Sequence, residues 1–154
     1  MRRLCPWKPH VKKGKDLLPL KVPQYEGNPG WILLTHDETG QPQTIFVDRN
    51  EKPIVLPMVM DERVFSDTVL RVIQVAKDVF LACDIRWLNG RYIYETMNYS
   101  ERRAKLDEML ELFHFPDLTA LIPYDEVSHD VPIRGYESYD DAPGSMGVFL
   151  PASE

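Results

Sequence analysis

Short runs of apolar and β-branched residues, separated by turn-forming residues, fill most of the chain between residues 31 and 94. Runs of this length and composition are typical of β-strands. The predicted strands span residues 31–35, 44–47, 54–60, 64–65, 70–75, 79–87 and 91–94. The stretch DETGQPQ between the first two runs predicts a β-hairpin, and Asn89-Gly90 predicts a tight turn before the last run. Residues 69–80 also fit helical spacing, so a helix is an alternative there.

One amphipathic helix is expected after these strands. Ser100 can cap its start, and Pro116 ends it. Its other face is charged, and its apolar stripe comprises Ala104, Leu106, Met109, Leu110 and Phe113. Residues 115–154 are rich in proline, glycine and acidic residues, with short apolar pieces at 118–122 and 148–150. We therefore predict an α+β fold, a mostly antiparallel sheet with at least one packed helix.

The size and composition fit one globular domain. The chain has 154 residues, of which 44% are hydrophobic and 27% charged, enough for a single core. Residues 1–23 are basic and rich in proline, which predicts an irregular arm and leaves 24–154 as the domain. No apolar run approaches about eighteen residues and no secretory leader is readable. We therefore expect no membrane partner and an intracellular location, cytoplasmic or nuclear.

Neither a metal site nor a cofactor is expected. The two cysteines, Cys5 and Cys83, and the four histidines lack the spacing of metal ligands, and the cysteines do not form a disulfide framework. The net charge of -6 argues against nonspecific capture of a nucleic-acid backbone as the main activity. The basic N-terminal residues are the one candidate patch for such contacts.

Five stretches, in chain order, are similar to motifs of one enzyme superfamily. They are QYEG at 24–27, VDRN at 47–50, MDERVF at 60–65, the segment 80–106 and GVFLP at 147–151. This series resembles the nucleotidyltransferase superfamily of messenger-RNA capping guanylyltransferases and ATP-dependent polynucleotide ligases. In that family the first motif is Lys-x-Asp-Gly, the second carries an arginine that contacts the ribose, and the third carries a glutamate. The resemblance implies a nucleotidyltransferase-like fold over roughly residues 20–151.

The positions that carry the family's chemistry differ in this chain. Gln24 stands where the family has the lysine that attacks the α-phosphate, and a side-chain amide is not a nucleophile under these conditions. Met146 replaces an acidic residue, and a thioether does not hold Mg²⁺. Cys83 replaces an aromatic residue that stacks on the base. These losses favour a pseudoenzyme, and enzymatic activity stays an open alternative.

Other motif positions are retained, and a noncatalytic branch of the family shows what they imply. The cap-binding domain of snurportin resembles this chain in the order of its strands and in lacking the nucleophilic lysine. That branch binds a methylated guanosine cap between aromatic surfaces. The predicted ligand-binding residues are Gln24, Gly27, Trp31, Arg49, Glu62 and Asp84. The remaining aromatic candidates are Trp7, Trp87, Tyr92 and Tyr94.

Structural alternatives exist for the retained positions. Gly27 fits a turn, Arg49 a surface cation, and Asp84 a local ion pair. Glu62 follows Asp61, which makes a paired-carboxylate site an alternative, although neighbouring residues of a strand face opposite sides.

Three functions stay open. The first is a noncatalytic domain that binds a nucleotide or an RNA cap. The second is a protein-interaction subunit that kept the fold, with the acidic segment 137–146 facing its partner. The third is a split or divergent nucleotidyltransferase, in which Lys8 of PWKP or Lys21 serves as the nucleophile.

Overall fold

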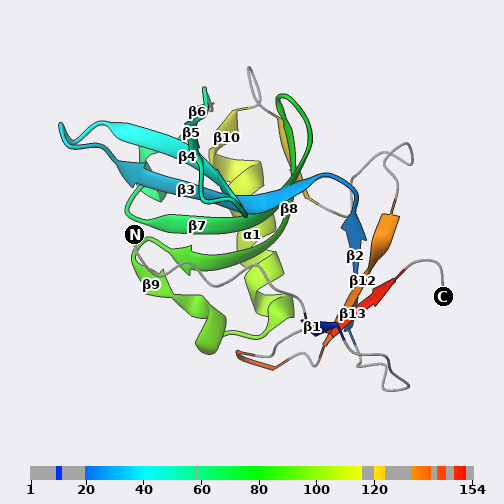
Figure 1. Ribbon diagram of the computed structural model, residues 1–154. Helices are drawn as coiled ribbons and strands as arrows, with labels where there is room; N and C mark the ends of the chain where they lie inside the picture. Colours follow the sequence, from blue (N-terminus) through cyan, green and yellow to red (C-terminus); the bar gives the residue numbers. More distant parts are fainter. Residues whose placement is uncertain are drawn as a thin grey trace.

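The computed structural model describes residues 10–11, 20–57, 59–115, 120–123, 133–139, 142–144 and 148–151. Within these residues the fold is α+β, with a mostly antiparallel sheet and one α-helix packed on it (Figure 1). The predicted fold class is therefore confirmed, and the likeness to nucleotidyltransferases stays a prediction. No helix in the described ranges has the length and apolar composition needed to cross a membrane.

A seven-stranded sheet forms the body of the structure. Its main strand order is β11-β8-β7-β3-β4-β5, and β9 pairs with β8. The strands are β3 (Asn28–His36), β4 (Pro42–Asp48), β5 (Pro53–Val55), β7 (Thr68–Ala76), β8 (Val79–Leu88), β9 (Arg91–Tyr92) and β11 (Ala120–Pro123). Neighbouring strands are antiparallel except β11 and β8. Trp31 of β3 pairs with Val47 of β4, which confirms the predicted hairpin.

Two smaller sheets flank this body. The first has the order β1-β13-β12-β2 and consists of β1 (His10–Val11), β2 (Leu20–Tyr25), β12 (Ile133–Tyr139) and β13 (Val148–Pro151). In the second, β6 (Val59–Met60) pairs with β10 (His114–Phe115). Strand β2 leads into β3 (Figure 1) and begins at Leu20, within the segment predicted as the arm. Val22 and Tyr25 pack against Ile73 and Leu81 of the large sheet.

Helix α1 (Tyr99–Phe113) begins one residue before the predicted cap. Asn98 Oδ1 accepts a hydrogen bond from the Glu101 N–H at 2.9 Å, and Glu101 Oε1 accepts one from the Asn98 N–H at 3.0 Å. This reciprocal pair is a capping box, which satisfies two backbone donors at the helix start. The prediction that Ser100 caps the helix is therefore wrong, because Asn98 lies three residues before a glutamate that can reciprocate.

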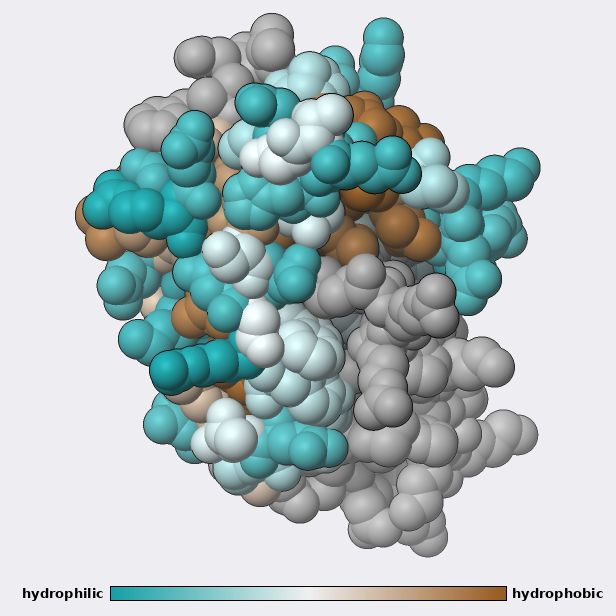
Figure 2. Space-filling model, turned by 90° about the vertical axis from the view of Figure 1, so that its left-hand side faces the viewer, coloured by the Kyte–Doolittle hydropathy of each residue, from teal (hydrophilic) through white to brown (hydrophobic). Residues whose placement is uncertain are grey.

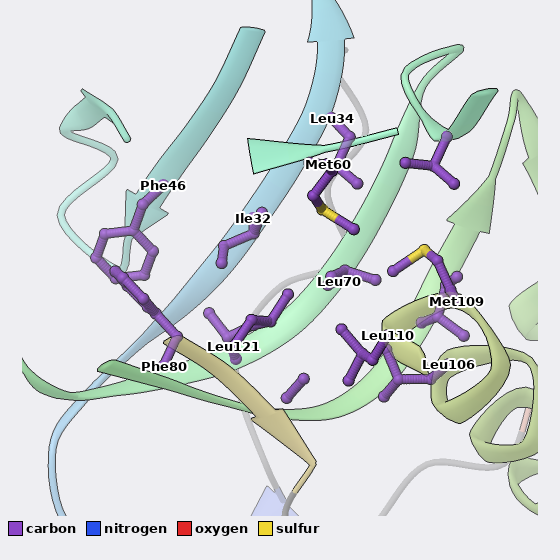
Figure 3. Close-up of a cluster of buried hydrophobic side chains, with 14 of the residues drawn as sticks. Ile32, Leu34, Phe46, Met60, Leu70, Phe80, Leu106, Met109, Leu110 and Leu121 are labelled. Carbon is purple, nitrogen blue, oxygen red and sulfur yellow. The ribbon is translucent and has the colours of Figure 1, made fainter. Parts of the chain in front are cut away.

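Helix α1 presents both apolar and charged side chains to the sheet. The main core beneath it (Figure 3) contains Leu106, Met109, Leu110, Ile32, Leu34, Phe46, Met60, Leu70, Phe80 and Leu121. Phe113 is half-buried against this core, whereas Ala104 of the predicted stripe is exposed. Arg102 and Arg103 are buried, although the sequence predicted charged residues on a solvated face. They are buried because both guanidinium groups find polar partners next to β8.

Two predicted strands are interrupted or absent. Residues 54–60 form β5 and β6 as separate short strands, and Pro57 between them lacks the N–H that a continuous ladder needs. Residues 64–65 are not a strand, because Val64 is the last residue of the 3₁₀ helix η1 (Glu62–Val64) and Phe65 is its C-cap. Asp61 caps this helix by accepting a hydrogen bond from the Arg63 N–H at 2.9 Å.

The structure also decides the secondary structure of residues 91–94 and 69–80. Residues 91–94 are strand only in β9, and the chain continues as the 3₁₀ helix η2 (Ile93–Glu95). Residues 69–80 lie in β7 and the start of β8, so the strand prediction is confirmed over the helical alternative. The apolar pieces at 118–122 and 148–150 fall in β11 and β13 as far as they are described.

Candidate functional site

Two predicted site residues lie where β2 leads into the large sheet. Gln24 is in β2, and its backbone is opposite Gly135 of β12. Gly27 lies in the turn before β3, where a Cβ would contact the backbone oxygen of Gln74 and lie 3.1 Å from Ile73 Cγ1. The absence of a side chain at Gly27 therefore allows this turn to pack closely on β7.

Arg49 and Glu62 lie on exposed surface in separate places. Arg49 is in the turn after β4 and makes no hydrogen bond or ion pair, judged over the residues that the structure describes. Glu62 begins η1, which lies at the end of α1, since the Asp61 N–H donates to the Phe113 carbonyl at 2.9 Å. Within the described residues neither side chain has a hydrogen bond or ion pair to another predicted ligand-binding residue, although Arg49 lies two residues after Val47, the strand partner of Trp31.

The carboxylates of Asp61 and Glu62 do not form a pair. Asp61 is held by the Arg63 side chain, with Nε 2.9 Å from Oδ1 and Nη2 2.9 Å from Oδ2. These hydrogen bonds, with that from the Arg63 N–H, lower the pKa of Asp61 to about 2. Asp61 is therefore a carboxylate paired with an arginine, a poor candidate for acid and base work at neutral pH.

Asp84 of β8 is the centre of a buried charged cluster. Its Oδ1 accepts hydrogen bonds from Arg102 Nε and from the Ile85 N–H, both at 2.8 Å, and its Oδ2 accepts one from Arg102 Nη2 at 3.2 Å. Arg86 Nε lies 3.1 Å from the same Oδ2. The side chains of Asp84, Arg102 and Arg86 are only 3%, 2% and 12% exposed. One carboxylate is thus shared by two guanidinium groups.

The local path of β8 explains why this cluster forms there. Strand β11 pairs with Val79–Ala82, and β9 pairs with Trp87 and Leu88. Between them, β8 has no neighbouring strand on that side among the described residues, and its register against β7 shifts on both sides of the Asp84 pairing. The start of α1 covers this gap, where the Tyr99 hydroxyl donates to the Cys83 carbonyl at 2.9 Å.

Tyr99 connects this gap to the second buried arginine. Arg103 Nη1 donates to the Tyr99 hydroxyl at 2.9 Å, and Arg103 Nη2 lies 3.5 Å from Asp107 Oδ1. Burial raises the pKa of Tyr99 far above its ordinary value, so the hydroxyl stays protonated and keeps its hydrogen bond to β8. Cys83 is thus a buried residue of this junction.

Four aromatic rings lie in a series of contacts that includes Arg86. We call this set the Arg86 row; it consists of Trp31, Arg86, Tyr94, Tyr92 and Trp87. The Arg86 guanidinium carbon is 3.9 Å from the Tyr94 ring centre and 5.7 Å from that of Trp31. The Tyr94 and Tyr92 ring centres are 5.9 Å apart, and those of Tyr92 and Trp87 are 5.0 Å apart. The row thus has one cationic group next to two of its four aromatic rings.

Strand alternation places part of this row away from α1. Trp31, Leu33 and Val69 form one apolar cluster with partly buried Trp87, while the intervening residues of β3 and β7 point into the core under α1. Arg71 is buried on β7 opposite both Trp31 and Asp84, and it makes contacts of its own. A third guanidinium group is therefore present near the row.

Of the six predicted ligand-binding residues, the structure brings Trp31 and Asp84 to the same arginine, Arg86. Sequence reasoning missed Arg86 and Arg102. The sequence did contain a signal for Arg86. Asp84 and Arg86 interrupt an apolar strand two residues apart, a spacing that places both side chains on the same face of the sheet. No comparable local signal pointed to Arg102. Its role depends on α1 crossing β8.

No protein-family model and no curated protein matches the chain. No group of three or more histidine, cysteine or acidic residues could hold a metal ion within the described ranges. The fold and the site define an α+β protein whose large sheet carries a buried Asp84–Arg102–Arg86 cluster beside a row of aromatic rings. This arrangement can bind flat and anionic groups.

Proposed function

We propose that this chain is a noncatalytic domain that binds a nucleotide or an RNA cap at the Arg86 row. The observation that carries the proposal is the Arg86 guanidinium group, 3.9 Å from the Tyr94 ring centre and part of a row with Tyr92 and Trp87. A nucleotide has a flat base and an anionic phosphate, so it can use both components of such a row.

The partly exposed rings are the candidates for contact with the base. Trp87, Tyr92 and Tyr94 keep some exposed surface, whereas Trp31 is buried. Stacking of a base on an aromatic side chain contributes about 1–3 kcal/mol. We therefore assign contact with the base to these partly exposed rings. Trp31 supports Arg86 instead, so its predicted role changes from direct ligand contact to support.

Binding without transfer is supported by the lysines whose side chains the structure describes. Gln24 occupies the position that resembles the family's nucleophilic lysine. The lysines whose side chains are described, Lys52, Lys77 and Lys105, are exposed and have no contact with the Arg86 row. Phosphoryl attack by lysine needs an amine close to the phosphate, so these positions support a binding role.

The test is titration of the purified chain with GTP, ATP and cap analogues while tryptophan fluorescence is followed. Trp31 and Trp87 belong to the row, so a bound nucleotide should change their emission. We expect Tyr92→Leu to weaken binding by about 1–3 kcal/mol and Tyr92→Phe, which keeps the ring, to bind like the parent chain. Absence of any response at millimolar ligand would remove the proposal.

Catalysis is tested separately with radiolabelled GTP or ATP, Mg²⁺ and a denaturing gel. The noncatalytic proposal predicts no labelled protein band. A covalent band would overturn it in favour of a divergent nucleotidyltransferase, and loss of the band in Lys8→Ala or Lys21→Ala would identify the nucleophile.

A protein-interaction function is the second candidate, favoured by the outer strand β5. Ile54 and Val55 of this strand are 49% and 62% exposed, and β5 ends the strand order of the large sheet. Figure 2 shows one face of the molecule on which most described side chains are hydrophilic and apolar ones gather toward the upper right. Exposed apolar residues on an outer strand suit contact with another chain. A pull-down in which Ile54→Lys and Val55→Lys abolish capture of a partner would support this function.

A further inference from the structure

We propose that Arg86 is an oxyanion anchor that binds a phosphate group of the ligand. This inference rests on the proposed function for the identity of the ligand, a nucleotide. The binding of an oxyanion by Arg86 rests on the geometry of the Asp84–Arg102–Arg86 cluster.

Arg86 shares its described carboxylate partner, Asp84, with Arg102. Asp84 is the only carboxylate with a described contact to Arg86, and its two oxygens already accept hydrogen bonds from Arg102 at 2.8 and 3.2 Å. All three side chains are largely shielded from water. Among the described contacts, Arg86 thus has only a share of one carboxylate where solvation is weak, and an incoming oxyanion would give it a second partner.

The donors of Arg86 are also available. Its Nε lies at ion-pair distance from Asp84 but without the geometry of a hydrogen bond. Within the part of the chain that the structure describes, the two terminal nitrogens of Arg86 donate no hydrogen bond. They form the planar two-donor edge that matches two oxygens of a phosphate.

The orientation of this edge is fixed before a ligand arrives. Tyr94 lies under the guanidinium group at 3.9 Å, and Asp84 holds the Nε side. Arg102 in turn fixes Asp84 and contacts the Tyr94 ring at 4.8 Å. Asp84 and Arg102 are thus positioning residues, and their effect on the ligand is transmitted through Arg86.

A phosphate is favoured over other oxyanions because of the neighbouring rings. Tyr94 contacts Arg86, Tyr92 contacts Tyr94 and Trp87 contacts Tyr92, so a group attached to an anion at Arg86 would have flat aromatic surfaces within reach. A nucleoside attached to a phosphate fits this arrangement. Arg49, the arginine that the sequence resemblance selected, is exposed in the turn after β4 and belongs to no such row.

The experiment measures binding of GTP, guanosine and inorganic tripolyphosphate by isothermal titration calorimetry. The chains are the parent, Arg86→Gln, Arg86→Lys and the control Arg91→Gln, which changes an exposed arginine of β9. We expect Arg86→Gln to weaken GTP and tripolyphosphate by tenfold or more and Arg86→Lys, which keeps the charge but loses the fork, by about tenfold. Guanosine affinity should be the same in all four chains, and Arg91→Gln should bind GTP like the parent.

Each result decides between the anchor and the proposed function. Equal GTP affinity in the parent and Arg86→Gln would overturn the anchor while leaving nucleotide binding in place. Tripolyphosphate binding that depends on Arg86, without any binding of nucleotides, would support the anchor and remove the proposed function. No binding of any of the three ligands would overturn both. If Arg86→Gln does not fold, as judged by circular dichroism, Arg86→Lys decides by the same criteria.

Discussion

The two ends of helix α1 contact the large sheet through different chemistry. Toward its C-terminal end, Leu106, Met109 and Leu110 pack into an apolar core. At its N-terminal end, Tyr99 and Arg102 bind β8 through hydrogen bonds and an ion pair. The same helix therefore uses burial of apolar surface at one end and buried charge at the other.

The difference teaches that the two ends stabilise the fold under different conditions. Full burial of a leucine or methionine side chain stabilises the folded state by roughly 1.5–3 kcal/mol without further conditions. A buried ion pair first loses its hydration, and an apolar replacement of similar shape is often as stable. The Asp84–Arg102 pair is thus an inefficient way to attach a helix. The pair also positions Arg86, whose Nε lies 3.1 Å from Asp84 Oδ2.

The largest expected effect is that of Asp84→Ala. Removing this carboxylate leaves Arg102 and Arg86 buried without their shared partner, and breaking a buried pair in this way costs about 3–5 kcal/mol in the free energy of unfolding. Chemical denaturation measures the loss. The control is Asp78→Ala, at an exposed position of the β7–β8 turn, which should change stability by less than about 0.5 kcal/mol. Equal stability of the two variants would show that the charged end does not hold the helix.

Leu106→Ala should have the next largest effect. Leu106 is fully buried in the core under α1, and truncation of such a leucine costs about 3 kcal/mol. Leu112→Ala on the exposed side of the helix is the matched control. Below its unfolding transition, Leu106→Ala should bind GTP like the parent chain, because the apolar end holds no ligand group. A loss of GTP affinity in folded Leu106→Ala would contradict this separation of the two ends.

The apolar end of α1 and most strands could be predicted from the sequence, because their signals are local. The β3–β4 hairpin follows from two apolar runs and a turn, and Leu106, Met109 and Leu110 recur with helical spacing. Boundaries were less accurate where a side chain competes with the strand pattern. Asp61 capping η1 is the clearest example.

The charged end could not be predicted in the same way. Asp84 and Arg102 are 18 residues apart in the chain, and their contact depends on how α1 crosses β8. Periodicity places a charged helical residue on the solvated side, and only a tertiary partner brings Arg102 inside. Motif order selected Arg49 and Glu62, but order along a chain does not show that side chains converge. The structure leaves both side chains exposed, and neither makes a hydrogen bond or ion pair with the Arg86 row within the described residues.

A smaller effect is expected for the cap of α1, which precedes its charged end. Asn98→Ala should lower the free energy of unfolding by about 1 kcal/mol, because the Glu101 N–H loses its partner. Ser100→Ala, at the position that the sequence suggested as the cap, should have less effect. Thermal denaturation followed by circular dichroism compares the two. A larger loss for Ser100→Ala would mean that the helix starts elsewhere, and the placement of Arg102 would need revision.

The smallest effect belongs to Asp61–Arg63, an exposed ion pair at the other end of α1 that contrasts with the buried Asp84–Arg102 pair. The pKa of Asp61 is lowered to about 2 from an ordinary value of 3.8, chiefly by the Arg63 side chain. The folded state therefore favours the carboxylate, so its contribution is present above the ordinary pKa and is lost as the pH falls toward about 2. The stability difference between the parent and Asp61→Asn should shrink over this range. It should also shrink in high salt, because exposed pairs are screened, whereas the effect of Asp84→Ala should persist. If salt changed the stability effects of Asp61→Asn and Asp84→Ala equally, the contrast between the exposed Asp61–Arg63 pair and the buried Asp84–Arg102 pair would be contradicted.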